Sequence, residues 1–130
     1  MQNKTKQIII VRRDLQLKRA AVAALVARAA VEFFVANDDS SKNDEIVIQL
    51  TPIESEWIAN GATRIVLGVP SESVLRSILF KAEIDGIQYY SIDGRADVRD
   101  ENSQTELLAA AMGPDECDKL DNITKVLKLL

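Results

Sequence analysis

Charged side chains cluster directly after the first apolar segment of the chain, at Arg12, Arg13, Asp14, Lys18 and Arg19. The sequence contains no histidine, the side chain that most often transfers protons near neutral pH. A general base would therefore have to be a carboxylate with a raised pKa, a lysine with a lowered pKa or a thiolate. The cluster is suited to two chemistries: phosphate binding by its cations, and proton transfer by Asp14 or Lys18.

Charge is distributed unevenly along the 130 residues. The first 30 residues contain seven basic side chains and one acidic one, whereas the remaining hundred contain nine basic and nineteen acidic ones. Such asymmetry can indicate a surface that faces a polyanion, but exposed basic loop residues give the same pattern, and we weigh that second interpretation more heavily. If RNA is the partner, we expect contacts from Arg12, Arg13, Lys18 and Arg19, and from Arg28 further along. No DNA partner is expected.

Apolar runs alternate with amphipathic segments, and this alternation predicts an α/β fold. The runs predict strands near 7–12, 63–69, 87–92 and 105–112. Capping and periodicity predict helices over 18–36, from the capping box at 51–54 to Gly61, from Pro70-Ser71 to Gly86, and over about 115–125. Together these elements predict a three-layer α/β/α sandwich with a small four-stranded, mostly parallel (mixed) sheet, in a single domain over 1–130.

The predicted strands and helices define a core and a place for a site. The core is expected to contain apolar residues from every layer: Ile9, Val11, Leu25, Val66, Leu79, Ile92 and Leu108. In folds of this class, functional groups lie at the carboxyl ends of strands. That rule directs attention to 12–19, to the residues after Val69 and to the loop after Ile92. The segment 37–50 is left open between a lid, a strand and disorder.

Several passages resemble the type 2 peptidyl-tRNA hydrolase family over nearly the whole chain. Val11-Arg12-Arg13-Asp14-Leu15 is similar to the family's Val-Arg-x-Asp-Leu after its first strand. Trp57-Ile-Ala-Asn-Gly61 before a strand, and Gly113-Pro114 before Asp121-Asn-Ile-Thr124, are similar to its later motifs. The resemblance implies the family's α/β fold and its activity, hydrolysis of the ester bond of peptidyl-tRNA.

The resemblance also places the family's polar residues on this sequence. The lysine, glutamine and histidine of the family's first helix fall at Ala21, Leu25 and Arg28. The family's Asp-Ala-Gly-Arg/His-Thr loop corresponds to the passage after Ile92, where Asp93 or Asp97 is the available carboxylate. Lys18 or Arg19 is a stand-in for the missing lysine.

Arg28 itself stays protonated and cannot act as a base. It lies one helical turn before Glu32. Pairs at this spacing attract each other, so we expect an ion pair between the two rather than a binding role for Arg28.

Three interpretations of function stay open. The favoured one is a divergent family member without hydrolase activity that serves as an interaction or weak RNA-binding module. The second is an active peptidyl-tRNA hydrolase, a carboxylic ester hydrolase, whose rebuilt site uses Asp14, Lys18 or Arg19, and the loop carboxylate Asp93. The third is a small-molecule binding domain on the same scaffold. Whether the chain is an enzyme depends on which of these holds.

The remaining features set the cellular context. Cys117 is the only cysteine, so no internal disulfide can form, and a reducing, cytoplasmic location is expected. Its acidic neighbours are expected to raise the pKa of its thiol and leave it inert. Those acids lack the pattern of a calcium loop, and no metal or cofactor is expected. The apolar runs are too short for a membrane span. A homodimer is one option for the oligomeric state.

Overall fold

The computed structural model describes residues 4–96 and 99–130. The strands are β1 (Thr5–Arg12), β2 (Arg64–Val69), β3 (Tyr89–Gly94), β4 (Glu106–Glu116) and β5 (Lys128–Leu129). The helices are α1 (Arg19–Ala36), α2 (Pro52–Ala59), α3 (Glu72–Ile84) and α4 (Cys117–Thr124). The α/β class and the four predicted strands and helices are confirmed, with β4 running past Gly113 and Pro114, where the sequence predicted its end.

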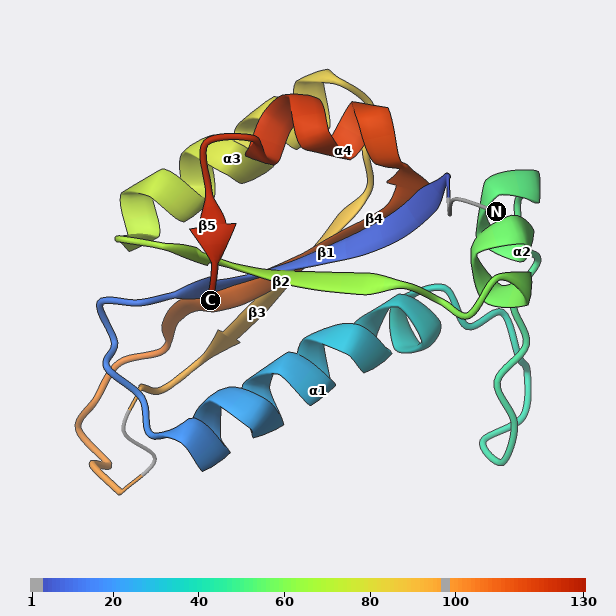
Figure 1. Cartoon of the computed structure of the whole chain (residues 1–130). Coiled ribbons are helices and arrows are strands. Elements are labelled where there is room, and N and C mark those ends of the chain that lie inside the picture. The colour runs from blue at the N-terminus through green and yellow to red at the C-terminus, as the bar shows by residue number, and fades with distance from the viewer. Residues whose placement is uncertain (1–3, 97–98) are drawn as a thin grey trace.

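The strands form one mixed sheet in the order β3-β4-β1-β2-β5 (Figure 1). Strand β1 is parallel to β2, whereas β4 is antiparallel to both β1 and β3, and β5 is antiparallel to β2. The expected four-stranded, mostly parallel arrangement is therefore corrected. The reason lies in the connection from 95 to 105, which contains no helix in its described part, so β3 and β4 pair as antiparallel neighbours. Strand β5 has two residues and was not predicted.

Helices cover both faces of the sheet (Figure 1). Helix α1 packs on one face against a cluster that includes Ile9, Val11 and Ile92. Helices α3 and α4 pack on the other face, where Ile8 and Ile10 of β1 point. This alternation along β1 gives the chain two buried clusters separated by the sheet.

The predicted core is confirmed at six of its seven positions. Val66 is half-buried and packs against the edge of the α1-side cluster. Helix α2 begins at the predicted capping box, in which Thr51 and Glu54 each accept a hydrogen bond from the other's backbone N–H. The segment 37–50 forms neither a helix nor a strand. No helix within the described ranges is both long enough and apolar enough to cross a bilayer.

Helix α1 packs on the sheet through one narrow stripe of buried residues. Its buried residues, Leu25, Ala29 and Phe33, recur every four positions and so form one stripe against the sheet. Alanines on either side of this stripe leave little side-chain volume near the start of the helix. The first turn carries no acidic residue, and Lys18 at the N-cap makes no side-chain capping hydrogen bond. The start of α1 therefore carries positive charge without a nearby acidic side chain of its own first turn.

Candidate functional site

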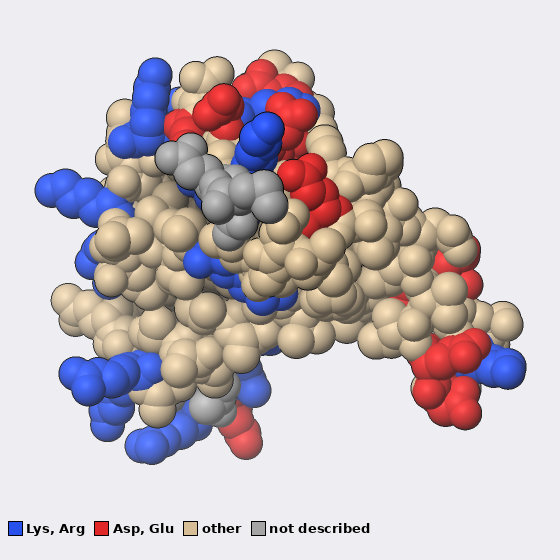
Figure 2. Space-filling view, turned by 45° about the vertical axis from the view of Figure 1, so that its right-hand side comes forward, with Lys and Arg blue, Asp and Glu red and all other residues tan. Residues whose placement is uncertain are grey.

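Basic side chains gather at the end of the molecule where β1 stops and α1 begins (Figure 2). Arg13, Lys18 and Arg19 are all exposed there, and their contact with RNA stays a prediction. Arg13 lies across Gly68 of β2, where a Cβ atom would collide with the Arg13 side chain, and it donates a hydrogen bond to the carbonyl of Leu129. The backbone N–H groups at the start of α1 add partial positive charge at the same end.

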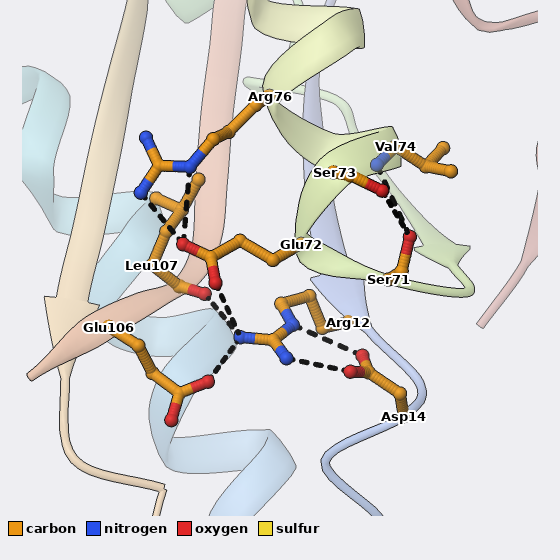
Figure 3. Close-up of polar contacts among 9 residues, drawn as sticks. All are labelled: Arg12, Asp14, Ser71, Glu72, Ser73, Val74, Arg76, Glu106 and Leu107. Carbon is orange, nitrogen blue, oxygen red and sulfur yellow. Dashed lines mark hydrogen bonds and ion pairs between the residues drawn. The ribbon is translucent and has the colours of Figure 1, made fainter. Parts of the chain in front are cut away.

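Arg12 differs from these neighbours because it is buried, with 8% of its surface exposed. Its guanidinium donates to both carboxylate oxygens of Asp14, at 2.6 and 3.1 Å, and to Glu106 at 2.5 Å (Figure 3). It also donates to the Leu107 carbonyl at 2.9 Å, and an oxygen of Glu72 lies 3.8 Å away. We call these residues the Arg12 cluster; it joins the end of β1 to β4 and to the first turn of α3.

The Arg12 cluster changes the roles expected of two residues. Its hydrogen bonds raise the pKa of Arg12 above its usual value, chiefly through Asp14. The hydrogen bond from Arg12 holds the pKa of Asp14 below its usual value. A general base near neutral pH needs the opposite shift, so Asp14 is poorly suited to that role in this arrangement. The prediction that Arg12 contacts RNA is corrected to a structural role, because its donors face Asp14, Glu106 and Leu107.

A groove lies on the other side of the sheet, between the start of α1 and the end of β3. Its volume is about 430 Å³, and its lining is Leu17, Ala21, Ala24, Leu25, Arg28, Gly94, Arg95, Ala96 and Leu108. We call it the α1 groove. The structure thus brings together Ala21, Leu25 and Arg28, the positions at which the resemblance places the family's lysine, glutamine and histidine. Among the described lining residues, only the two arginines are ionisable.

The predicted loop carboxylate does not enter the α1 groove. Ile92 is buried in the α1-side cluster, and Asp93 lines a concave surface on the side of α3 with Glu72 and Arg76. Successive strand residues point to opposite faces, which explains this placement. The alternative carboxylate, Asp97, lies outside the described residues. Asp93 is therefore separated from the groove by the strand that carries it.

The expected ion pair between Arg28 and Glu32 is absent from the described structure, and that prediction is wrong. Arg28 instead extends toward the end of β3, where its Nη1 lies 3.6 Å from the position of a Cβ built on Gly94. Sequence reasoning directed attention to the loop after Ile92 but did not identify Gly94 and Arg95 as groove residues, and it placed Leu108 in the core rather than on a groove wall.

Cys117 and the acidic residues near it form a separate region at the start of α4. Burial raises the pKa of the Cys117 thiol, with Asp121 and Asp118 adding to the effect and Lys6 opposing it. The predicted direction is confirmed, but burial is the larger cause. No group of three or more metal-ligating side chains is arranged to hold an ion in residues 4–96 and 99–130.

Comparison with known proteins tests the resemblance directly. The sequence model of a family described as Peptidyl-tRNA hydrolase PTH2 matches residues 5–130. A peptidyl-tRNA hydrolase of Methanocaldococcus jannaschii is 31% identical over 125 residues, which cover 96% of this chain and 99% of that protein.

Two further relatives carry related names. A peptidyl-tRNA hydrolase of Haloquadratum walsbyi is 34% identical over 128 residues, covering 95% of this chain and 98% of that protein. The mitochondrial peptidyl-tRNA hydrolase 2 of Bos taurus is 30% identical over 126 residues, covering 95% of this chain and 63% of that protein. The similarity extends from β1 to the C-terminus, and the chain belongs to the peptidyl-tRNA hydrolase PTH2 family.

Proposed function

We propose that this protein binds peptidyl-tRNA through its basic end and hydrolyses it far more slowly than its relatives do. The observation that carries the proposal is the lining of the α1 groove. Where the family's first helix presents a lysine, a glutamine and a histidine, this chain has Ala21, Leu25 and Arg28. The basic end supports the binding part of the proposal, and the groove lining supports the slow hydrolysis.

Binding is supported by the exposed cations next to the groove. Arg13, Lys18 and Arg19 are exposed at one end of the molecule, and the first turn of α1 carries no acid that would repel phosphate. Phosphate contacts of this kind release counterions, so the affinity should fall steeply as salt rises. Figure 2 shows acidic side chains at the top and at the right of the molecule, and we expect these to disfavour phosphate outside the basic end.

Slow hydrolysis is supported by where the ionisable groups lie. The two arginines of the groove stay protonated and cannot take a proton from water. Asp14 is paired with Arg12, and Asp93 faces the side of α3. Loss of a positioned proton-transfer group costs on the order of 10²- to 10⁴-fold in rate. We therefore expect turnover at least about 100-fold below that of an active relative.

Active hydrolysis with a rebuilt site is the second candidate, and the comparisons favour it over a loss of activity. The relatives that match over nearly the whole chain are named peptidyl-tRNA hydrolase. In this alternative, Asp14 with Lys18 or Arg19 would carry out the chemistry. It requires Asp14 to leave the Arg12 guanidinium, or to act on water while bound to it.

A peptidyl-tRNA hydrolysis assay separates the two candidates. The purified protein and the Methanocaldococcus jannaschii relative are compared on the same substrate, together with Asp14→Asn and the triple variant Ala21→Lys, Leu25→Gln, Arg28→His. We expect weak parent turnover and a gain in the triple variant. The matched control is Ala23→Lys, an exposed change on α1 that does not line the groove. Parent turnover equal to that of the relative, and lost in Asp14→Asn, would establish the second candidate.

A tRNA-binding titration tests the other half of the proposal. Binding of the parent is measured at low and moderate salt beside the triple variant Arg13→Ala, Lys18→Ala, Arg19→Ala. We expect weak, salt-sensitive binding that this variant loses. Binding that is absent at low salt, or unaffected by the substitutions, would reject the basic end as an RNA surface.

A further inference from the structure

The α1 groove has the lining of a small-ligand site. Its volume of about 430 Å³ lies within the range of ordinary ligand pockets. Leu17, Ala21, Leu25 and Leu108 give it an apolar surface. Such pockets bind through apolar contact and use a few polar groups to orient the ligand. The polar groups on the described lining are the side chains of two arginines, so a ligand that fits this groove should be apolar with a negative charge at one end.

The two arginines are available for that charge. Arg28 makes no hydrogen bond or ion pair within the described residues, and Arg95 makes one weak contact, 3.5 Å to the carbonyl of Asp100. Both side chains are exposed, and no carboxylate lies on the described lining. The guanidinium group presents planar, paired donors that match a carboxylate well. The groove therefore attracts an anion locally, although the chain as a whole carries a net charge of −4.

Gly94 keeps the space between these groups open. A Cβ atom at Gly94 would lie 3.0 Å from Leu108 Cδ1 and 3.6 Å from Arg28 Nη1. The backbone at Gly94 is not in the left-handed region, so its conformation does not demand glycine. A larger residue would occupy the space where Leu108 and Arg28 approach each other. The absence of a side chain therefore leaves apolar surface and cation accessible to the same ligand.

We propose that the α1 groove binds a small apolar carboxylate, with its apolar body on Ala21, Leu25 and Leu108 and its carboxylate held by Arg28 and Arg95. The proposal does not rest on tRNA binding, because the groove lining contains none of Arg13, Lys18 and Arg19. Among the described residues Arg28 has no ion-pair partner, and the ligand carboxylate would supply one. The apolar lining would supply the affinity that a surface ion pair alone does not.

Titration of the isotope-labelled protein followed by two-dimensional NMR tests this proposal. The probes are 4-phenylbutyrate, its neutral amide, phenyl phosphate and acetate. We expect 4-phenylbutyrate to shift amides at the start of α1 and the end of β3. The amide should bind at least about 10-fold more weakly, and acetate should not bind measurably. Equal binding of acid and amide, or no binding of the acid up to its solubility limit, would overturn the proposal.

Variants locate the binding. Arg28→Gln and Arg95→Gln should each weaken 4-phenylbutyrate at least about fivefold, and Gly94→Val should abolish its binding. Because Gly94→Val crowds Leu108, Ala24→Phe provides a second way to fill the groove. The matched control is Arg19→Gln, which removes a cation from the same helix outside the groove lining. An equal loss in Arg19→Gln, or tighter binding of phenyl phosphate than of the carboxylate, would contradict the proposed ligand class.

Discussion

Arg12 and Arg28 lie on opposite sides of the same sheet, and their surroundings differ in nearly every respect. Arg12 is 8% exposed and makes ion pairs with Asp14, Glu72 and Glu106. Arg28 is exposed and makes no ion pair within the described residues. Burial of a cation is costly unless carboxylates compensate it, whereas a cation in water needs no partner. The first arginine is therefore held by the carboxylates around it, whereas the second has no ion-pair partner among the described residues, which is the premise of the proposed ligand site.

This difference gives a physical meaning to the motif Val11-Arg12-Arg13-Asp14-Leu15. Arg12 and Asp14 of the motif bind each other through two hydrogen bonds, and Arg12 also connects β1 to β4 through Glu106. The motif can thus persist in a chain because the end of β1 depends on it, whether or not the groove keeps its chemistry. Residues on the α1 side can change independently, because the sheet separates the two regions.

The contrast between the two arginines would be wrong if removal of Arg12 cost little stability. In Arg12→Met, three carboxylates would lose their shared cation while the volume stays similar. Removal of one partner from a buried ionic cluster typically costs 3–5 kcal/mol, and because these carboxylates are about one-third exposed we expect a loss of about 3 kcal/mol. Urea unfolding measures it. Arg76→Met, which removes an exposed cation from Glu72, is the control and should cost under about 1 kcal/mol.

Leu25 tests whether the apolar character of the groove is also structural. It is 8% exposed and belongs to the stripe that packs α1 on the sheet. Leu25→Ala should lower the free energy of unfolding by about 2 kcal/mol, near the lower limit for buried leucines because the site opens onto the groove. Thermal or urea unfolding provides the measurement. Ala21→Ser, on the exposed part of the same groove, should change stability by less than about 0.5 kcal/mol.

The sequence predicted the fold better than it predicted the site, for a physical reason. Apolar runs and the capping box at Thr51 are local signals, and they located β1, α2 and α3 closely. The direction of β4 depends on its partner strands, so it was not readable from alternation of strands and helices. The partners of Arg12 are distant in sequence: Glu72 begins a helix, and Glu106 begins a strand.

The positions of single side chains were the least predictable. Asp93 was chosen for its place in the loop, but strand alternation directs it away from the groove. Arg28 was expected to pair one turn along its own helix, whereas it extends to β3 because Gly94 leaves space there. Both depend on contacts between elements, which helix and strand periodicity do not contain. Ala21, Leu25 and Arg28, in contrast, line one groove together, as helical spacing on one face of α1 leads one to expect.

The Arg12 cluster should also make the stability of the protein depend on pH. The pKa of Asp14 in the folded state lies below its usual value because of the hydrogen bond from Arg12. A depressed folded-state pKa means that the stabilisation is present above the unfolded pKa and is lost as the pH falls through the folded one. Asp14→Asn should therefore reduce stability near pH 7 by on the order of 1 kcal/mol, with a smaller effect at acidic pH. Urea unfolding from pH 7 down to pH 3 measures both.

The double variant Arg12→Met, Asp14→Asn is the control for that experiment. Without Arg12, the main cause of the low pKa of Asp14 is gone. The change at Asp14 should then have little further effect on the slope of stability against pH. A slope that responds to Asp14→Asn equally in both backgrounds would mean that the pair does not set the acid response.

Among the changes at charged residues, Arg28→Gln should have the smallest effect on stability, so it tests directly whether the two arginines differ as described. The side chain is exposed and has no ion-pair partner within the described structure, so its removal breaks no ion pair seen there. Arg95 lines the same groove, so loss of one of two like charges there adds no electrostatic cost, and the free energy of unfolding should stay within about 0.5 kcal/mol of the parent. Urea unfolding at low and high salt measures it, with Arg12→Gln as the matched change on the other side. A loss above 1 kcal/mol at Arg28 would show that the α1 side also depends on a buried or paired cation. In that case the groove arginine would be part of the fold rather than a binding group.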